Sequence, residues 1–339
     1  MDFSCYLIKM IKSWDYQNEY TYLKKDILKS IDRVLKSGTL FFGNELNKFE
    51  KKFLKTNNSK YGIAVASGTD AIYLSLKALD IGPNDEVITV ANTAIPTVSA
   101  IRNTGASVKF IDTRSDYLMD PNKLEKALSK KTKIIIPVHL YGQSCEMDKI
   151  LKIANKYKIK VIEDCAQAQG AIYDKKRVGN MGITGCFSFY PTKILGAYGD
   201  GGLITTNSDE VAHMAKMLRN HGGLNKYCNE VLGYNSRLDS VQAAILSVKL
   251  PHIDSWNNGR REVAKRYKEL LSDVPGVIVP EVVEGHVFHQ YTIRVTDCNR
   301  DELVAAMAEA GVSCMIYYPI PQDKLPVYEG MFGEYPVSN

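Results

Sequence analysis

The chain has 339 residues, of which 45% are apolar and 24% charged, and its formal net charge is +5. This length suggests about two domains with a large core, and no apolar run reaches the roughly 20 residues that a membrane-spanning helix needs. Lysine and arginine are scattered among acidic residues, whereas nucleic-acid binding typically uses a clustered basic stripe. We therefore expect a globular protein that binds neither membrane nor nucleic acid.

The N-terminal segment and the cysteines bear on the cellular compartment. Residues 1–10 are mildly apolar, but they contain Asp2 and Lys9 and lack a small-residue cleavage site, so we expect no signal peptide and a cytoplasmic location. The cysteines are odd in number and show no CxxC spacing, which predicts reduced thiols with neither a disulfide framework nor a metal site. They are Cys5, Cys145, Cys165, Cys186, Cys228, Cys298 and Cys314.

The first two thirds of the chain predict an α/β fold. Apolar residues recur at helical spacing from Tyr22 to Ser37, where Gly38 ends the pattern, and a second predicted helix runs from Asn44 to about Leu54. Short apolar strands then alternate with helices that start near Asp70, Pro96, Asn122 and Glu146. The predicted strands are Tyr61–Ala66, Glu86–Val90, Ser107–Ile111, Lys133–His139 and Lys160–Glu163. This alternation indicates a mainly parallel central sheet with helices on both faces.

The pattern changes after Glu163. Two further predicted strands, Cys186–Phe189 and Gly202–Thr206, follow each other without a full helix between them, and we expect them to form a hairpin at the sheet edge. A long helical stretch from Asp239 to about Leu271 is broken near Pro251. The strand, helix and strand expected beyond Pro275 are His289–Val295, Arg300–Ala310 and Ser313–Tyr317. We predict a large domain over residues 1–245 and a small α/β domain over 246–339.

Ligands of open α/β sheets bind beyond the carboxyl ends of the strands, and two polar segments are predicted there. In Ala66–Asp70 a strand gives way to a helix, and this turn either binds a phosphate or is an ordinary turn with a capping hydroxyl. Glu163 and Asp164 close an apolar strand. They are either a solvated strand end or carboxylates that keep a heteroaromatic nitrogen protonated, which makes a pyridinium ring an electron sink.

Two further segments contain candidate functional residues. Lys193 follows the aromatic stretch Phe187–Tyr190 and precedes glycines at positions 196, 199, 201 and 202. It is either a surface charge or a lysine whose lowered pKa frees the amine for Schiff-base chemistry, with the glycines admitting a bulky cofactor. Gly233–Asp239 is a polar loop before a long helix.

The order of these segments resembles the fold-type I aminotransferases and, more narrowly, the DegT/StrS family of sugar aminotransferases. The resemblance extends from about Trp14 to the C-terminus. It rests on Val65–Ala71, Pro137–Gly142, Glu163–Ala168, Ser188–Gly202 and Gly233–Asp239, of which the segment around Lys193 is the most specific.

The resemblance implies pyridoxal 5'-phosphate as cofactor and a role for each matching residue. Lys193 would bind the cofactor covalently and act as the general acid–base, Asp164 would pair with the pyridine nitrogen, and Gln167 would bond the phenolic oxygen. The cofactor phosphate would be held by Gly68, Thr69 and Ser188, and by Asn235 of the partner subunit, which implies a homodimer with shared active sites.

The family further implies the reaction. An amino acid, usually glutamate, would donate the amino group to a nucleotide-linked ketosugar, with dTDP or UDP as the nucleotide, for cell-surface polysaccharide or glycoside biosynthesis. The segment Asn92–Ile101 and Gly222 favour the third sugar carbon over the fourth.

The chain also departs from the family. Ala94 stands where an aromatic residue often covers the cofactor ring, so we expect another residue to cover that face or a more open site. Gln169 replaces a frequent histidine and is assigned no acid–base role. Tyr317-Tyr318-Pro319 replaces a common His-Tyr-Pro, and we expect this segment to contact the sugar. Family members usually continue beyond the equivalent of Asn339 with a helix and a strand, so the small domain is expected to be truncated.

Two other functions stay open at this point. One is a ketosugar dehydrase on the same fold, but that branch has a histidine in place of Lys193. The other is a non-catalytic regulatory or sensing protein, which predicts a cofactor site that has lost at least one anchoring residue, whereas those named above are present.

Overall fold

The computed structural model describes residues 10–225, 227–328, 333 and 335–338. The N-terminal segment considered for a signal peptide, apart from Met10, lies outside the described residues, as does Cys5. In the described part of the chain, every helix is too short or too polar to cross a membrane.

A seven-stranded sheet forms the centre of the molecule, with the strand order β1-β9-β8-β5-β4-β2-β3. Its strands are β1 Tyr61–Val65, β2 Glu86–Val90, β3 Ser107–Ile111, β4 Thr132–Ile135, β5 Lys160–Asp164, β8 Thr184–Ser188 and β9 Gly202–Thr206. The pairs β3–β2, β2–β4, β4–β5 and β5–β8 are parallel, whereas β9 is antiparallel to both β8 and β1. The predicted mainly parallel sheet is thus confirmed.

The expected position of β8 and β9 was wrong. The two strands do pair with each other, but β9 also pairs with β1, so β1 and not the β8–β9 hairpin lies at this edge. Every residue of β8 and β9 is buried. Strands that are covered on both faces bury most apolar surface inside a sheet, which explains their central position.

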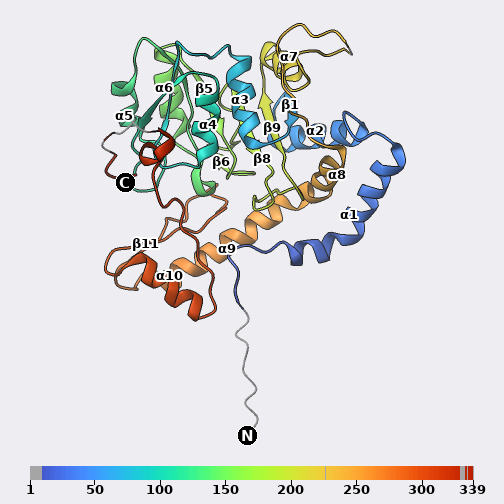
Figure 1. The fold of residues 1–339 in the computed structure, drawn as a ribbon. Coiled ribbons are helices and arrows are strands. Elements are labelled where there is room, and N and C mark those ends of the chain that lie inside the picture. The colour runs from blue at the N-terminus through green and yellow to red at the C-terminus, as the bar shows by residue number, and fades with distance from the viewer. Residues whose placement is uncertain (1–9, 226, 329–332, 334, 339) are drawn as a thin grey trace.

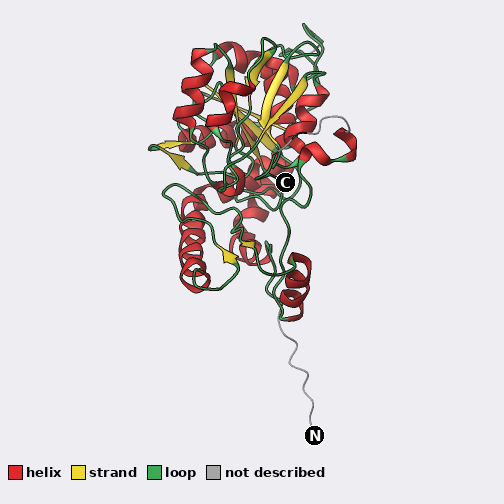
Figure 2. Cartoon of the chain, turned by 90° about the vertical axis from the view of Figure 1, so that its left-hand side faces the viewer, coloured by secondary structure: helices red, strands yellow, loops and turns green. Residues whose placement is uncertain are grey.

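Helices cover both faces of the sheet (Figures 1 and 2). On one face α2 (Asn44–Asn57) and α8 (Ser240–Lys249) pack against β8 and β9 around Phe49, Phe187 and Leu246. On the other face lie α3 (Gly68–Ala78), α4 (Ile95–Asn103) and α7 (Asp209–Leu218). The remaining helices of this part are α1 (Gln17–Ser37), α5 (Pro121–Ala127) and α6 (Met147–Lys156). Helix α7, capped by Ser208, was not predicted.

The C-terminal part is simpler than the sequence predicted. The break near Pro251 is confirmed as the short turn η2 (Leu250–His252), after which α9 (Ile253–Leu271) leads away from the sheet to α10 (Arg300–Glu309), as Figure 1 shows. Only Arg294–Val295 of the first predicted strand forms a strand (β11), and it pairs with β10 (Val277–Ile278).

The predicted strand Ser313–Tyr317 is absent from the structure. A strand needs a partner, and among the described residues the only strand-like pairing near it joins Val312 to Ile11. A small hairpin of β6 (Ile172–Tyr173) and β7 (Lys176–Arg177) was not predicted. The domain boundary expected after residue 245 falls within α8, and the division into two domains stays a prediction.

Candidate active site

A cavity of about 300 Å³ lies at the carboxyl ends of β1, β5 and β8. Six of the seven residues predicted to bind a cofactor line it: Gly68, Thr69, Asp164, Gln167, Ser188 and Lys193. Asn235 is not among the described residues that do so. The remaining lining residues include Ser67, Thr93, Ala94, Pro96, Thr97, Val138, Tyr190 and Asp200. The topology thus brings together residues up to 134 positions apart, from Ser67 to Gly201.

At one end of the cavity, helix α3 begins at Gly68. Ser67 caps the helix, since its hydroxyl accepts from Asp70 N–H at 3.0 Å and its carbonyl from Ala71 N–H at 3.0 Å. Within the described residues, the N–H groups of Gly68 and Thr69 have no protein acceptor. Free N–H groups at the positive end of a helix dipole favour an anion, so the turn is both a capped helix start and a potential phosphate site.

The same turn shows why a glycine precedes Thr69. A Cβ atom at position 68 would lie 2.6 Å from the Cβ of Ser188, at the end of β8. Only glycine therefore allows the helix start and the Ser188 hydroxyl to approach one anion from two sides. Pyridoxal phosphate carries such an anion, and this cradle fits it.

Asp164, the last residue of β5, is 4% exposed and is held by two hydrogen bonds. Its Oδ2 accepts from the Thr97 hydroxyl at 2.7 Å, and its Oδ1 accepts from Ala166 N–H at 3.1 Å. Burial raises the pKa of Asp164 above its usual range, although the two hydrogen bonds and the nearby charge of Lys193 act in the opposite direction. A cationic ring nitrogen placed beside the carboxylate would favour its ionised form.

Glu163 points to the opposite side of β5, because side chains alternate along a strand. One carboxylate oxygen lies 3.1 Å from Nε2 of His139, and backbone N–H groups of Gly179, Met181 and Gly182 donate to Glu163 at 2.7–2.8 Å. With Cys165, these side chains form the one group of potential metal ligands in the described chain. The hydrogen bonds already occupy the Glu163 carboxylate, so we interpret the cluster as an anchor for the end of β5.

Lys193 follows β8 in a turn in which its N–H donates to the Tyr190 carbonyl at 2.8 Å. Burial lowers the pKa of Lys193 from its usual value, and the charge of Asp164 offsets this only in part. A lysine of lowered pKa holds more of the neutral amine, which is the nucleophilic form.

Gln167 is engaged by two neighbours in the protein. Its Oε1 accepts from Tyr141 N–H at 2.7 Å, and its Nε2 donates to the Tyr318 hydroxyl at 2.8 Å. Within the described part of the chain, the second amide hydrogen of Gln167 has no acceptor and can bind a ligand. The contacts of Thr97 with Asp164 and of Tyr318 with Gln167 were not predicted. Thr97 lies in the first turn of α4 and Tyr318 in a loop, and only their hydroxyls could have indicated these contacts.

Ala94 lines the cavity as expected, and its methyl group leaves that wall without an aromatic ring. Tyr190 also lines the cavity and is 52% exposed, which places an aromatic side chain at its rim.

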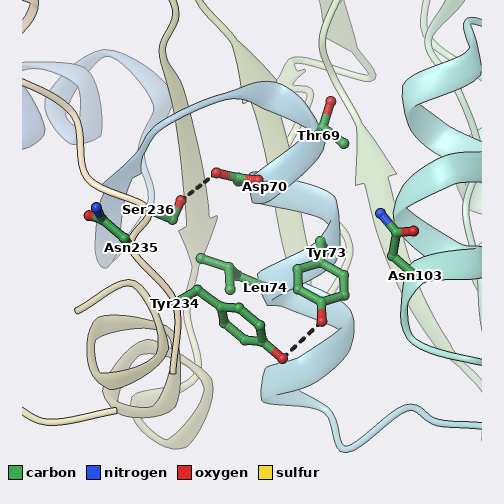
Figure 3. Close-up of a pocket in the computed structure, with 8 residues that line it drawn as sticks. All are labelled: Thr69, Asp70, Tyr73, Leu74, Asn103, Tyr234, Asn235 and Ser236. Atoms are coloured by element: carbon green, nitrogen blue, oxygen red, sulfur yellow. Dashed lines mark hydrogen bonds between the residues drawn. The ribbon is translucent and has the colours of Figure 1, made fainter. Parts of the chain in front are cut away.

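Asn235 lies in a second pocket of about 470 Å³ on the flank of α3 (Figure 3). There the Ser236 hydroxyl donates to Asp70 at 2.7 Å, and the hydroxyls of Tyr73 and Tyr234 are 2.8 Å apart. Thr69 lines both pockets. Asn235 is therefore beside α3 but is not a wall residue of the cavity that contains Lys193 of the same chain.

The sheet topology and the cavity at its carboxyl edge are those of fold-type I, the class of pyridoxal-phosphate-dependent aminotransferases. The DegT/DnrJ/EryC1/StrS aminotransferase family matches residues 21–339, and the chain belongs to this family. The fold class, the cofactor and the aminotransferase class predicted from sequence are thereby confirmed.

Individual relatives cover nearly the whole chain. A "Pleiotropic regulatory protein" of Geobacillus stearothermophilus is 46% identical over 94% of this chain and 86% of its own length. The dTDP-3-amino-3,4,6-trideoxy-alpha-D-glucose transaminase of Micromonospora megalomicea subsp. nigra is 41% identical over 95% of this chain and 91% of its own. The crystal structure of S. venezuelae DesV with a ketimine intermediate superposes with a TM-score of 0.94 at 38% identity, over 97% of this chain and 90% of that one.

Proposed function

We propose that this aminotransferase converts the keto group of a nucleotide-linked sugar into an amine. The observation that carries the proposal is the single cavity in which the Lys193 amine, the Asp164 carboxylate and the start of α3 converge. The proposed nucleotide is dTDP or UDP, the proposed donor is glutamate, and the proposed pathway makes a cell-surface polysaccharide or a glycoside. The protein is proposed to act in the cytoplasm.

Lys193 is the proposed catalytic residue. When bound, pyridoxal phosphate supplies an electron sink for the electron pair left by breaking a C–H bond next to nitrogen. Lys193 would bind the cofactor covalently. The Lys193 amine, whose pKa burial lowers, would also take the proton from one carbon and return it to another as general base and acid.

The other proposed cofactor residues divide between two ends of the cavity. Asp164 would keep the ring nitrogen protonated, and the remaining amide hydrogen of Gln167 would reach the phenolic oxygen. Gly68, Thr69 and Ser188 would hold the phosphate through N–H and hydroxyl donors.

Amination at the third sugar carbon is the finer part of the proposal. The name of the Micromonospora relative, a dTDP-linked 3-amino sugar transaminase, supports this carbon and dTDP as the nucleotide. A regulatory role is the second candidate function, because the Geobacillus relative is named a pleiotropic regulatory protein. That candidate predicts a decayed cofactor site, whereas Lys193 and Asp164 are both present in the cavity, which favours the enzyme. Lys193 likewise disfavours a dehydrase.

A substrate screen tests the proposed reaction. We expect purified protein, loaded with pyridoxal phosphate and given glutamate, to aminate a 3-keto nucleotide sugar in preference to its 4-keto isomer. NMR of the product shows which carbon carries the amine. Turnover of neither isomer with any amino-acid donor would contradict the enzymatic proposal, and a 4-amino product would correct the position.

The shared active site is tested with Asn235, whose amide is proposed to reach the cofactor phosphate of the partner subunit. A hydrogen bond to an anion is typically worth about 1.5–3 kcal/mol, so Asn235→Ala should weaken cofactor retention by at least about tenfold. Its place outside the cavity of its own chain supports action on the partner. Cofactor retention is measured by absorbance after dialysis.

Mixing Asn235→Ala with Lys193→Ala makes the test specific. If Asn235 acts on the partner's site, a mixed dimer has one site with both defects and one with neither, so activity returns at limiting cofactor. If it acts on its own site, each site keeps one defect. No return of activity, with subunit exchange confirmed by mass spectrometry, would exclude the shared site.

A further inference from the structure

Residues 194–201, between Lys193 and β9, form a loop without helix or strand. One side of this loop is held by Phe189, the residue directly after β8, because Ala197 N–H donates to the Phe189 carbonyl at 2.7 Å and Phe189 N–H donates to the Gly201 carbonyl at 2.7 Å. At Gly196 a Cβ atom would lie 2.4 Å from the Pro191 carbonyl oxygen. The chain therefore closes tightly around Lys193, and the direction of the lysine depends on how this loop is fixed.

The other side of the loop lies against α8. Gln242 and Lys249 are seven residues apart, so they are two turns apart on the same face of this helix. The Gln242 amide binds both main-chain groups of Tyr198: Oε1 accepts from the N–H at 2.9 Å and Nε2 donates to the carbonyl at 3.2 Å. The Lys249 ammonium donates to the Gly196 carbonyl. One helix face thus makes three hydrogen bonds to the main chain of residues 196–198.

Lys249 is an unusual residue for this purpose, because it is only 2% exposed. Burying a cation is costly unless it is paired. Glu19 on α1 supplies the pairing charge at 2.7 Å, and the ammonium also lies 4.9 Å from the centre of the Tyr198 ring. An apolar side chain could fill the same space without this cost, but it would leave the Gly196 carbonyl without its donor.

The packing of helix α1 against α8 places Glu19 beside Lys249. Leu23 and Ile27 are buried against Ile245 of α8, which holds Glu19 close to Lys249. The N-terminal helix therefore contributes a charge to the region around the lysine loop, although it supplies no wall residue of the cavity in the described chain.

We propose that Lys249 and Gln242 are positioning residues for Lys193. The face of α8 that carries them, with Glu19 as the counter-charge, fixes the main chain of residues 196–198 and so presents the Lys193 amine to the cavity. This inference rests on the proposed role of Lys193. It predicts that α8 controls how fast Lys193 captures the cofactor, and not only how stable the fold is.

Hydrogen–deuterium exchange of the cofactor-free protein tests the inference directly. Lys249→Met should speed exchange in residues 194–201 by about tenfold or more, the effect of losing one hydrogen bond to a charged group, and Gln242→Leu should give a smaller increase. Both variants should also capture pyridoxal phosphate more slowly, as followed by absorbance. Lys52→Met is the matched control, because Lys52 donates to the Ser247 carbonyl of α8 at 3.4 Å without touching the loop.

Three results would overturn the inference. The first is an exchange rate in residues 194–201 equal to that of the unmodified protein in both variants. The second is an exchange rate that rises equally in α6 and in the loop. The third is an unchanged rate of cofactor capture. If Lys249→Met does not fold, Gln242→Leu decides by the same criteria. Failure of the proposed function looks different, because neither ketosugar isomer would then be aminated while loop exchange and cofactor capture still responded to the changes in α8.

Discussion

Lys193→Ala should abolish both covalent capture of pyridoxal phosphate and turnover. Alanine has no amine to bind the cofactor or to carry the proton between carbons, and losing a general acid–base alone typically costs about 10²–10⁴-fold in rate. The absorbance band of the lysine-bound cofactor should be missing from the purified variant. Stopped assays with glutamate and the preferred ketosugar measure the remaining activity.

Lys152→Ala is the matched control for this experiment, since Lys152 is an exposed lysine on α6 and does not line the cavity. It should keep the band and the rate of the unmodified protein. Normal transamination by Lys193→Ala would show that the central assignment is wrong, whatever the cofactor content of the variant.

Asp164→Asn should keep the fold but reduce turnover by about a hundredfold or more, on the scale of general acid–base effects. Asparagine has nearly the same shape, and its oxygen can still accept from Ala166 N–H while its NH₂ group donates to the Thr97 hydroxyl. A neutral amide cannot keep a pyridine nitrogen protonated, so the electron sink weakens although the cavity stays intact.

Thermal unfolding and bound cofactor are measured beside the rate to separate chemistry from folding. Asp120→Asn is the control, because Asp120 caps α5 and asparagine caps helices about as well as aspartate. A rate for Asp164→Asn close to that of the unmodified protein would remove Asp164 from the reaction.

The local sequence pattern was sufficient to predict most helices and strands of the large α/β part. β2, β3 and β9 have the predicted bounds, and the break between α8 and α9 lies at Pro251. These segments are short apolar runs between turn residues, or an amphipathic stretch with a proline, and each signal is contained within a few residues. Six of the proposed site residues meet in one cavity because the sequence placed their segments at strand ends, where a parallel sheet gathers them.

Only the tertiary structure decided which strands pair and which segments pack against each other. Nothing within β9 indicates that it lies between β8 and β1, and the predicted strand at Ser313–Tyr317 lacks a neighbour and stays irregular. The contact between Lys249, Glu19 and the Gly196 carbonyl joins three segments that lie far apart in the chain. A sequence pattern records which face of a segment is apolar, whereas these contacts depend on which segments pack together, and packing is settled only when the whole core forms.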